Sequence, residues 1–392
     1  MKKRLLILGA SHFQVPFIAL AKELGAYVGV VDINKEAPGK EYADEFFNCS
    51  LLDKDKVLKI ATDFKAEGIT VGTCEVGVVT AAYIADKLGL PFFSQEVAKK
   101  ATNKIEMIKE FFKHGVAAPD YEVIREGDPI RTNIPFPVIT KPADKSASRG
   151  IFFVEKEENL SRGVEISMKA SDSKEVLIEE FMYGPEFSVE LGVEKTNPVA
   201  LQLTDKITNG APHYVEIGQA QPLELPTDVQ EAAKKLACDA ARAIGLNNCA
   251  GHAEIKWTPT GLKMVEIGGR MGGHYVDADL LESSSGYHLQ EAVIRFALGE
   301  DFVLKRTVPK GPTGMMCILS KEGKIKSITG VEEAKQIPGI IKVVMSCKVG
   351  DTYHEGVSNN DLIGFAVACA DSKEKAISIC NEALGKINIV YE

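Results

Sequence analysis

Short apolar runs alternate with amphipathic stretches through the first hundred residues. Arg4 to Leu8 forms one run, and a helical pattern from about Pro16 to Leu24 separates it from a second run, Tyr27 to Val31. Strands that alternate with helices in this way are typical of a doubly wound parallel sheet. The pattern continues with a helix at Lys54 to Glu67, a strand at Ile69 to Thr73, a helix at Val78 to Leu88 and a strand at Pro91 to Phe93.

The turn after the first run invites a dinucleotide-binding interpretation, because Asp32 stands at the end of the second run. The glycine pattern of such sites fails, since Ser11 and Gln14 occupy the positions of the second and third glycines. An oxidoreductase or a non-catalytic nucleotide-binding protein stays open. Glu75 follows the third strand, at the sheet edge that binds ligands, and is either a substrate contact or a plain charged loop residue.

The middle of the chain shows strands that end in polar residues. A polar helix from Ser94 to His114 precedes two apolar runs, Phe136 to Pro142 and Ile151 to Val154, which predict a hairpin. Lys141 lies beside its tip, Asp144 to Gly150, and Ser/Gly-rich tips of this kind either close over phosphates or are flexible turns.

A second pair of predicted strands flanks a predicted break in the chain direction. A predicted helix at Glu157 to Ala170 comes first. The segment from Val176 to Glu190 then contains one strand before Gly184-Pro185 and a second strand after it. Such a break predicts a hinge, where backbone groups can read the edge of an adenine while apolar side chains cover its face.

Two further alternating runs, Gly251 to Trp257 and Met264 to Gly268, predict a hairpin with a Pro-Thr-Gly turn. With Gly261 in the left-handed position of a three-residue loop, Glu254 faces Glu266. Facing carboxylates repel unless a cation lies between them, and Mg²⁺ takes one or two carboxylates plus substrate phosphates. Arg270, in the glycine-rich stretch that follows, can bind a phosphate bidentately. The alternative is a surface hairpin with solvated glutamates.

Two further regions of the chain are interpreted as structural. A helix at Asp228 to Ile244 has a plain apolar face and is interpreted as scaffold. The stretch beyond Leu304 carries no catalytic constellation. Beyond Leu304 we expect a lid or packing domain with these elements: a hairpin of Met315 to Ser320 and Ile325 to Ile328, strands at Ile340 to Met345 and Phe365 to Ala370, a helix at Lys373 to Leu384 and a strand at Ile387 to Tyr391.

Composition narrows the class of protein. The chain has 392 residues, which is enough for two or three domains, and a net charge of −9, which disfavours nucleic acid and anionic membranes as partners. No run approaches the eighteen apolar residues of a membrane span, so we expect a cytoplasmic protein. The eight cysteines are scattered without a C-x-x-C pair, which argues against structural zinc and a disulfide framework.

Taken in order, these motifs resemble the ATP-grasp superfamily. They are Asn103-Lys104, Lys141-Pro142 with its Ser/Gly loop, Glu179 to Met182 with Gly184-Pro185-Glu186, and then Glu254, Glu266 and Arg270. The resemblance implies an α/β and α+β chain with the ATP-grasp fold. It implies a Rossmann-like, biotin-carboxylase-like domain at 1–94, an ATP-grasp domain at 95–303 with a flexible lobe at about 120–185, and a small C-terminal α+β domain at 304–392.

The same resemblance implies ATP and Mg²⁺ as cofactors, with Mn²⁺ as an alternative metal. Glu254 and Glu266 would ligate the metal, and Arg270 would stabilise the transferred phosphate. The residues implied for the nucleotide are Lys104 and Lys141 on the phosphates, Ser146, Ser148 and Gly150 in the loop that closes over them, Glu179, Glu180, Phe181 and Met182 around adenine, and Glu186 on the ribose.

Within the superfamily the chain is similar to the bacterial L-amino acid ligases, the bacilysin-type dipeptide synthetases. A small residue, Gly268, replaces the Asn found two positions after the second metal ligand in many ATP-grasp enzymes, and the run from Cys249 to Lys256 is like theirs. The stretch from Tyr214 to Pro222 resembles their substrate loop, with Glu216 placed to read an amino group. Gln219 stands where that loop has His, and His274, next to Gly273, stands where an aromatic residue is usual.

The resemblance implies an ATP-dependent carboxylate–amine ligase that forms an amide through an acyl phosphate and releases ADP and phosphate. Its partners would be small molecules, an amino acid among them, and a homodimer stays open. The substrate contacts would be Glu75, Glu216, Gln219, Arg270, Gly273 and His274. The alternative is a purine-biosynthetic or carboxylating ATP-grasp enzyme that acts on formate, bicarbonate or a ribonucleotide.

Overall fold

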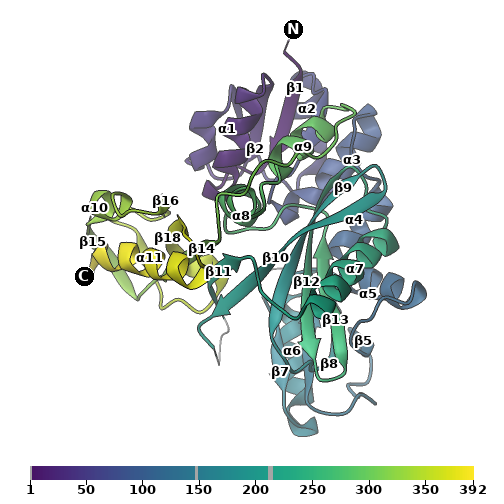
Figure 1. Cartoon of the computed structure of the whole chain (residues 1–392). Helices are drawn as coiled ribbons and strands as arrows, with labels where there is room; N and C mark the ends of the chain where they lie inside the picture. Colours follow the sequence, from purple (N-terminus) through teal and green to yellow (C-terminus); the bar gives the residue numbers. More distant parts are fainter. Residues whose placement is uncertain (1, 146–148, 211–214) are drawn as a thin grey trace. The chain divides into compact units, whose positions relative to one another are not determined.

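The computed structural model describes residues 2–145, 149–210 and 215–392 (Figure 1). The chain divides into two compact units. The first comprises Met1–Ala200, Pro226–Met271 and Glu291–Val303, and the second comprises Leu201–Leu225, Gly272–Gln290 and Leu304–Glu392. No helix within the described ranges is long and apolar enough to cross a membrane.

The first unit begins with a four-stranded parallel sheet of order β3-β2-β1-β4, which confirms the predicted doubly wound start. Leu5 to Leu8 are fully buried, because helices cover this strand, as expected for an apolar run without alternation. The elements are β1 (Arg4–Leu8), α1 (Val15–Glu23), β2 (Tyr27–Asp32), β3 (Glu45–Asn48), α2 (Lys54–Asp63), β4 (Gly68–Thr70) and α3 (Val78–Leu88).

The strand predicted at Pro91 to Phe93 is wrong, since this segment has no regular secondary structure. Pro91 lacks the N–H that a ladder needs, and Phe93 is buried as a core side chain. The single helix predicted from Ser94 to His114 is also wrong. It is two helices, α4 (Gln95–Thr102) and α5 (Lys104–Lys113), because Asn103 is extended between them and caps the second.

The turn after β1 is filled by the Gln14 side chain, at a position where a dinucleotide-binding turn has a glycine. The Gln14 side-chain nitrogen donates to the carbonyls of Leu8 and Val71, and its oxygen accepts from the Thr73 N–H. The Asp32 carboxylate accepts from the Ala10 N–H. These groups serve the chain's own loops, so the dinucleotide interpretation loses its support.

A smaller antiparallel sheet, of order β5-β8-β6-β7, follows. The predicted β6–β7 hairpin is confirmed, and α6 packs on the sheet over a core of Val138, Ile178 and Val164. The elements are β5 (Tyr121–Arg125), β6 (Val138–Pro142), β7 (Phe152–Val154), α6 (Leu160–Ala170) and β8 (Glu175–Glu180).

Three long antiparallel strands complete the first unit, in the order β13-β12-β9: β9 (Glu186–Glu194), β12 (Cys249–Thr258) and β13 (Gly261–Gly268). Helix α7 (Thr227–Ile244) packs against them (Figure 1). Along β9, Phe187, Val189 and Leu191 alternate with Glu186, Ser188 and Glu190. Alternation gives the sheet one apolar and one polar face, and the polar face carries the acidic pair of the predicted hairpin.

The predicted pairing of Glu254 with Glu266 is confirmed, although the turn differs from the prediction. Thr258 pairs directly with Gly261, so the loop has two residues rather than three. An irregularity between Glu254 and Ile255 then shifts the register by one position and restores the predicted pairing. Gly261 has a positive φ of 120°, as the turn requires.

The second unit contains β11, β14, β18 and β16 in that order, with α11 packed on β14 and β18, and a small sheet of order β17-β15-β19. The hairpin predicted at 315–328 is wrong, because β14 pairs with β11 and β18 while β15 pairs with β17 and β19. The remaining bounds are β10 (Asn197–Thr208), β11 (Glu216–Gln221), a π-helix (Val276–Leu280), α8 (Leu281–Ser285), α9 (Leu289–Ala297), β14 (Thr313–Leu319), β15 (Gly323–Thr329), α10 (Val331–Lys335), β16 (Ile340–Met345), β17 (Thr352–Tyr353), β18 (Leu362–Cys369), α11 (Lys373–Lys386) and β19 (Asn388–Tyr391).

Candidate active site

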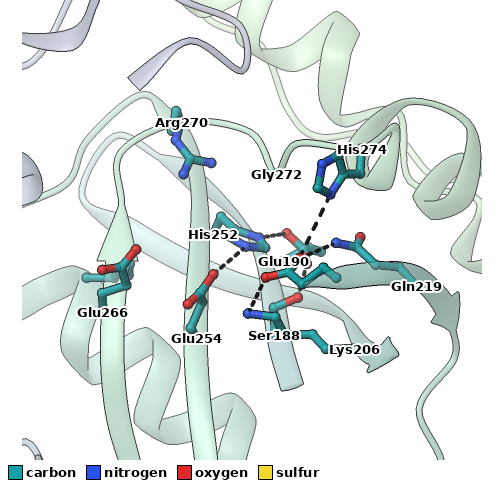
Figure 2. A network of polar contacts seen from close by, with 12 residues as sticks. Ser188, Glu190, Lys206, Gln219, His252, Glu254, Glu266, Arg270, Gly272 and His274 are labelled. Atoms are coloured by element: carbon teal, nitrogen blue, oxygen red, sulfur yellow. Dashed lines mark hydrogen bonds and ion pairs between the residues drawn. The ribbon is translucent and has the colours of Figure 1, made fainter. Parts of the chain in front are cut away.

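The polar face of β12 and β13 holds the two facing glutamates, Glu254 and Glu266 (Figure 2). Lys104 reaches Glu266 from the start of α5, with its Nζ 2.5 Å from the Glu266 Oε2. Burial alone lowers the pKa of Lys104, but the negative charges of Glu266 and Glu75 outweigh burial and raise this pKa above its usual value. The lysine is therefore a fixed positive charge beside the acidic pair.

The donor set fits a metal that arrives with a nucleotide. No group of three His, Cys, Asp or Glu side chains in the described part of the chain could hold a metal ion. Two carboxylates on one face are nevertheless what Mg²⁺ takes from a protein when phosphate oxygens and water complete its octahedron. Glu254 and Glu266 are thus suited to a metal–nucleotide complex rather than to a resident metal.

Arg270 lies just beyond β13 and is held by Glu75. Its Nη2 and Nε are 2.8 Å and 3.2 Å from the Glu75 Oε2, and its Nη1 donates to the Met271 carbonyl. Burial raises the pKa of Glu75, but the Arg270 charge outweighs burial and lowers this pKa below its usual value. The structure therefore brings these two residues together as an ion pair, with Glu75 orienting the guanidinium.

In the smaller sheet, Lys141 on β6 and Glu179 on β8 form a buried ion pair. Ile139 is the direct partner of Glu179, so Lys141 is its diagonal neighbour on the same face. The Lys141 Nζ lies 2.7 Å from the Glu179 Oε2, and both residues are 5% exposed. The ion pair therefore fixes the position of the Lys141 ammonium group.

The predicted adenine hinge follows β8. The Lys256 Nζ donates to the Met182 carbonyl at 3.2 Å, and the Lys263 Nζ lies 2.7 Å from the Glu180 Oε2. Phe181 makes edge-to-face contacts with two other aromatic rings. Glu186, which opens β9, lies 3.8 Å from the Lys256 Nζ. The hinge segment therefore contains an apolar surface beside backbone groups.

The loop predicted to close over phosphates lies partly outside the described residues. Ser146 and Ser148 lie outside the described residues, as does Tyr214 of the proposed substrate loop. Gly150 has a φ of 75°, and a Cβ there would lie 2.5 Å from the Ala170 Cβ. Close packing and backbone conformation therefore explain this glycine without a nucleotide.

A row of hydrogen-bonded, buried polar side chains next to Glu254 was not predicted from the sequence motifs. His252 Nδ1 lies 2.8 Å from the Glu190 Oε2, His252 Nε2 lies 3.5 Å from the Glu254 Oε1, and the Ser188 hydroxyl donates to Glu190 (Figure 2). Burial lowers the pKa of His252, but the Glu190 charge outweighs burial and raises this pKa to about 10. The signal in the sequence was the alternation of Glu186, Ser188 and Glu190 along a strand that is otherwise apolar.

The second unit gathers three of the proposed substrate residues. The Glu216 carboxylate lies 3.0 Å from the Lys206 Nζ, accepts from the Gln219 Nε2 at 3.1 Å and lies 3.9 Å from the His274 Nδ1 (Figure 2). Gly273 precedes His274, and a Cβ built on it meets no atom within 4 Å. Lys206, which the sequence analysis did not single out, is thus part of this cluster.

Comparisons with known proteins agree with the fold. The chain matches the ATP-grasp domain over residues 134–278 and the L-amino acid ligase C-terminal domain 2 over residues 315–392. The L-arginine-specific L-amino acid ligase of Bacillus subtilis is 22% identical, and the match covers 96% of this chain and 94% of that protein. The matches with other curated relatives cover between 16% and 69% of the length of those proteins.

Two solved structures are similar along their whole length. The crystal structure of the L-amino acid ligase from Bacillus licheniformis has a TM-score of 0.84 at 20% identity, covering 100% of this chain and 99% of that one. The structure of phosphoribosylglycinamide synthetase from Anaerococcus prevotii has a TM-score of 0.83 at 25% identity, covering 100% of both chains.

The fold and the match over residues 134–278 define an ATP-grasp protein. ATP-grasp proteins use ATP together with Mg²⁺. The match at the C-terminus narrows this class. The chain is an ATP-grasp ligase, an ATP-dependent enzyme that forms C–N bonds, and it carries the second C-terminal domain of the L-amino acid ligases.

Proposed function

We propose that this enzyme joins the carboxylate of an amino acid to an amine in an ATP-dependent reaction that proceeds through an acyl phosphate. The observation that carries the proposal is the pair of facing glutamates, Glu254 and Glu266, flanked by the fixed positive charges of Lys104 and Arg270. An arrangement of this kind stabilises negative charge on a phosphoryl group in transfer.

In the proposed reaction, an oxygen of the substrate carboxylate attacks the γ-phosphorus, and ADP leaves. The nitrogen of the amine then attacks the acyl carbon, loses a proton and expels inorganic phosphate. No side chain forms a covalent bond to the substrate in either step. The carboxylate, which is a poor electrophile, is in this way converted into an acyl phosphate, which is a good one.

The residues of the first unit are proposed to bind and orient the nucleotide. Lys104 and Lys141 contact phosphate oxygens, the backbone from Glu179 to Met182 reads the adenine edge, and Glu186 accepts from the ribose hydroxyls. Mg²⁺ on Glu254 and Glu266, for which Mn²⁺ is a proposed substitute, supplies neutralising charge to the phosphates. Arg270 is held ready for the transferred phosphoryl group by Glu75.

The residues of the second unit are proposed to recognise the first amino acid. Glu216 lies in a buried polar cluster and would accept from its amino group, with Gln219, Gly273 and His274 lining the same pocket. The likeness to L-amino acid ligases in the C-terminal domain supports an amino acid rather than another carboxylate.

A second function is favoured by one observation. The phosphoribosylglycinamide synthetase of Anaerococcus prevotii is as similar in fold as the L-amino acid ligase, with a somewhat higher identity. The alternative is therefore a purine-biosynthetic or carboxylating ligase, with a ribonucleotide, formate or bicarbonate as substrate.

We propose a division into a pre-ATP-grasp domain at 1–94, an ATP-grasp domain at 95–303 and a C-terminal domain at 304–392. We also propose a homodimer and a cytoplasmic location, where ATP is supplied.

The test is a screen of amino acid pairs with ATP and Mg²⁺, with release of phosphate and ADP measured together and products identified by mass. We expect at least one pair to yield a dipeptide with one ADP and one phosphate for each amide bond. Parallel reactions contain glycine with phosphoribosylamine, or bicarbonate with an aminoimidazole ribonucleotide. Turnover in these reactions alone would establish the alternative, and AMP with pyrophosphate would contradict both.

A further inference from the structure

A buried hydrogen-bond acceptor without a donor lies in the polar cluster around Glu216 in the second unit. Gln219, on β11, is 4% exposed, and its Nε2 donates to the Glu216 Oε2 at 3.1 Å. Its other amide atom, Oε1, is buried and has no hydrogen-bond partner among the described residues. Buried polar atoms in folded proteins nearly always have a hydrogen-bond partner, and leaving one without a partner lowers stability.

The Glu216 carboxylate determines which way the Gln219 amide is oriented. A carboxylate only accepts hydrogen bonds, so Glu216 must face the Nε2 of Gln219 rather than its oxygen. Rotating the amide would place two oxygens against each other and leave an N–H without an acceptor. The oxygen is therefore held in the position where it awaits a donor.

Glu216 supplies the negative charge of this cluster. Its Oε1 faces the Lys206 Nζ at 3.0 Å, and its Oε2 faces Gln219, with the His274 Nδ1 at 3.9 Å. A carboxylate attracts an ammonium group and accepts hydrogen bonds from it. The cluster thus offers acceptors from two residues, Glu216 and Gln219.

The backbone behind this cluster is held in an unusual conformation. His274 and Tyr275 are consecutive non-glycine residues with positive φ values of 51° and 61°, and a π-helix starts at Val276. The His274 ring stacks on Phe365 with a centroid separation of 6.2 Å. Strained backbone and π-helical turns concentrate at functional sites, which supports a ligand pocket here.

We propose that Gln219 is a specificity-determining residue whose amide oxygen accepts an N–H from the α-ammonium group of the first amino acid, while Glu216 accepts another. The inference rests on the proposed function, in which this pocket takes that amino acid. An ammonium group has three protons and satisfies both acceptors. A hydroxyl or an N,N-dimethylammonium group has one and leaves one acceptor buried without a donor. The pocket therefore selects free amino acids over their α-hydroxy and N,N-dimethyl counterparts.

The experiment measures equilibrium binding to the full chain without ATP, by calorimetry. The probes are the proteinogenic L-amino acids, followed by the α-hydroxy and N,N-dimethyl counterparts of the tightest binder. We expect the wild type to prefer the free amino acid by about 10- to 100-fold, the range for a hydrogen bond to a charged group. In Gln219→Leu this preference should fall by about 10-fold, with the affinity of the counterparts nearly unchanged.

A matched control is Gln202→Leu, which removes an amide from β10 whose Nε2 contacts the Ser284 hydroxyl at 3.4 Å and whose Oε1 accepts from the Leu203 N–H at 3.2 Å. It should keep the wild-type preference. Gln219→Met, which is unbranched like glutamine, replaces the leucine variant if the latter melts at a much lower temperature. An equal loss for all three ligands, an unchanged preference, or no amino acid binding to the wild type would overturn the inference.

The readout separates this inference from the proposed function, since binding requires no phosphoryl transfer. If dipeptide formation is absent but the preference falls in Gln219→Leu, only the ligase reaction is wrong. If the wild type forms dipeptides but the preference does not depend on Gln219, only the role of Gln219 is wrong.

Discussion

The two proposed metal ligands are held by different neighbours. Glu254 faces His252, which is itself fixed by the fully buried Glu190, whereas Glu266 faces the ammonium group of Lys104. Hydrogen bonds to ligating carboxylates fix their orientation and tune metal affinity. These contacts would hold both carboxylates in place for the proposed cation before a nucleotide binds.

The first prediction concerns Glu266→Gln. The amide keeps the shape of the side chain but removes its charge, so ADP formation should fall by about 100-fold or more, because a metal at the transferring phosphoryl group supplies several kcal/mol. The chain should stay folded, with a lower melting temperature because Lys104 loses its ion-pair partner. The measurement is steady-state ADP release together with a thermal melt.

Glu175→Gln is the control for this variant, since it removes a strand carboxylate whose partner, Arg125, is 57% exposed at the side chain. Exposed ion pairs contribute little, so this variant should behave as the wild type. Near-full turnover by Glu266→Gln would remove the metal role of this residue.

Contacts between site side chains could be predicted from the sequence where the two residues are close together in the chain. The facing of Glu254 and Glu266 follows from strand alternation and one turn. The pairing of Arg270 with Glu75, or of Lys104 with Glu266, joins residues far apart in the chain and follows from no local pattern. Cys249 needs no distant partner: burial raises the pKa of its thiol to about 12, as is usual for a cysteine that packs in a core.

At the scale of elements, the break between α4 and α5 determines where Lys104 lies. Asn103 is extended, its side chain accepts from the N–H groups of Ile105 and Glu106, and Lys104 is the first residue of α5. Helical periodicity runs on through this junction, so the sequence pattern predicted one helix. The capping side chain, rather than the apolar period, marks the break.

The second prediction uses this junction. Asn103→Ala should cost about 1 kcal/mol of stability, the usual loss for an N-cap, and should also raise the KM for ATP several-fold because Lys104 loses its fixed position. Ser94→Ala removes the cap of α4, where the Ser94 hydroxyl accepts from the Val97 N–H. It should cost a similar amount of stability with an unchanged KM for ATP. Equal KM values in the two variants would contradict the role of this junction.

Strand positions were predicted better than strand partners. The run at 315–320 and the run at 325–328 are both strands, yet they pair with other strands. The Lys-Glu-Gly sequence between them predicts a turn, but the choice of partner is made by long-range burial, as shown by Ile325 packed with Cys347 and Ile363.

At the scale of the whole molecule, likeness of fold does not choose the substrate. Both the L-amino acid ligase and the phosphoribosylglycinamide synthetase align with the full chain at similar TM-scores. Function in such a superfamily is decided by the chemistry of the site. The match of the C-terminal domain and the polar cluster around Glu216 are what favour an amino acid.

The central claim is that a carboxylate is activated by γ-phosphoryl transfer, and one measurement tests it most directly. Amino acid labelled with ¹⁸O in its carboxylate is supplied with ATP, Mg²⁺ and the amine found in the screen, and the phosphate and nucleotide are analysed by mass. Attack of the carboxylate on the γ-phosphorus carries one labelled oxygen into inorganic phosphate for each amide formed, with unlabelled ADP as the nucleotide product. Label in AMP, or phosphate free of label, would contradict the acyl-phosphate account.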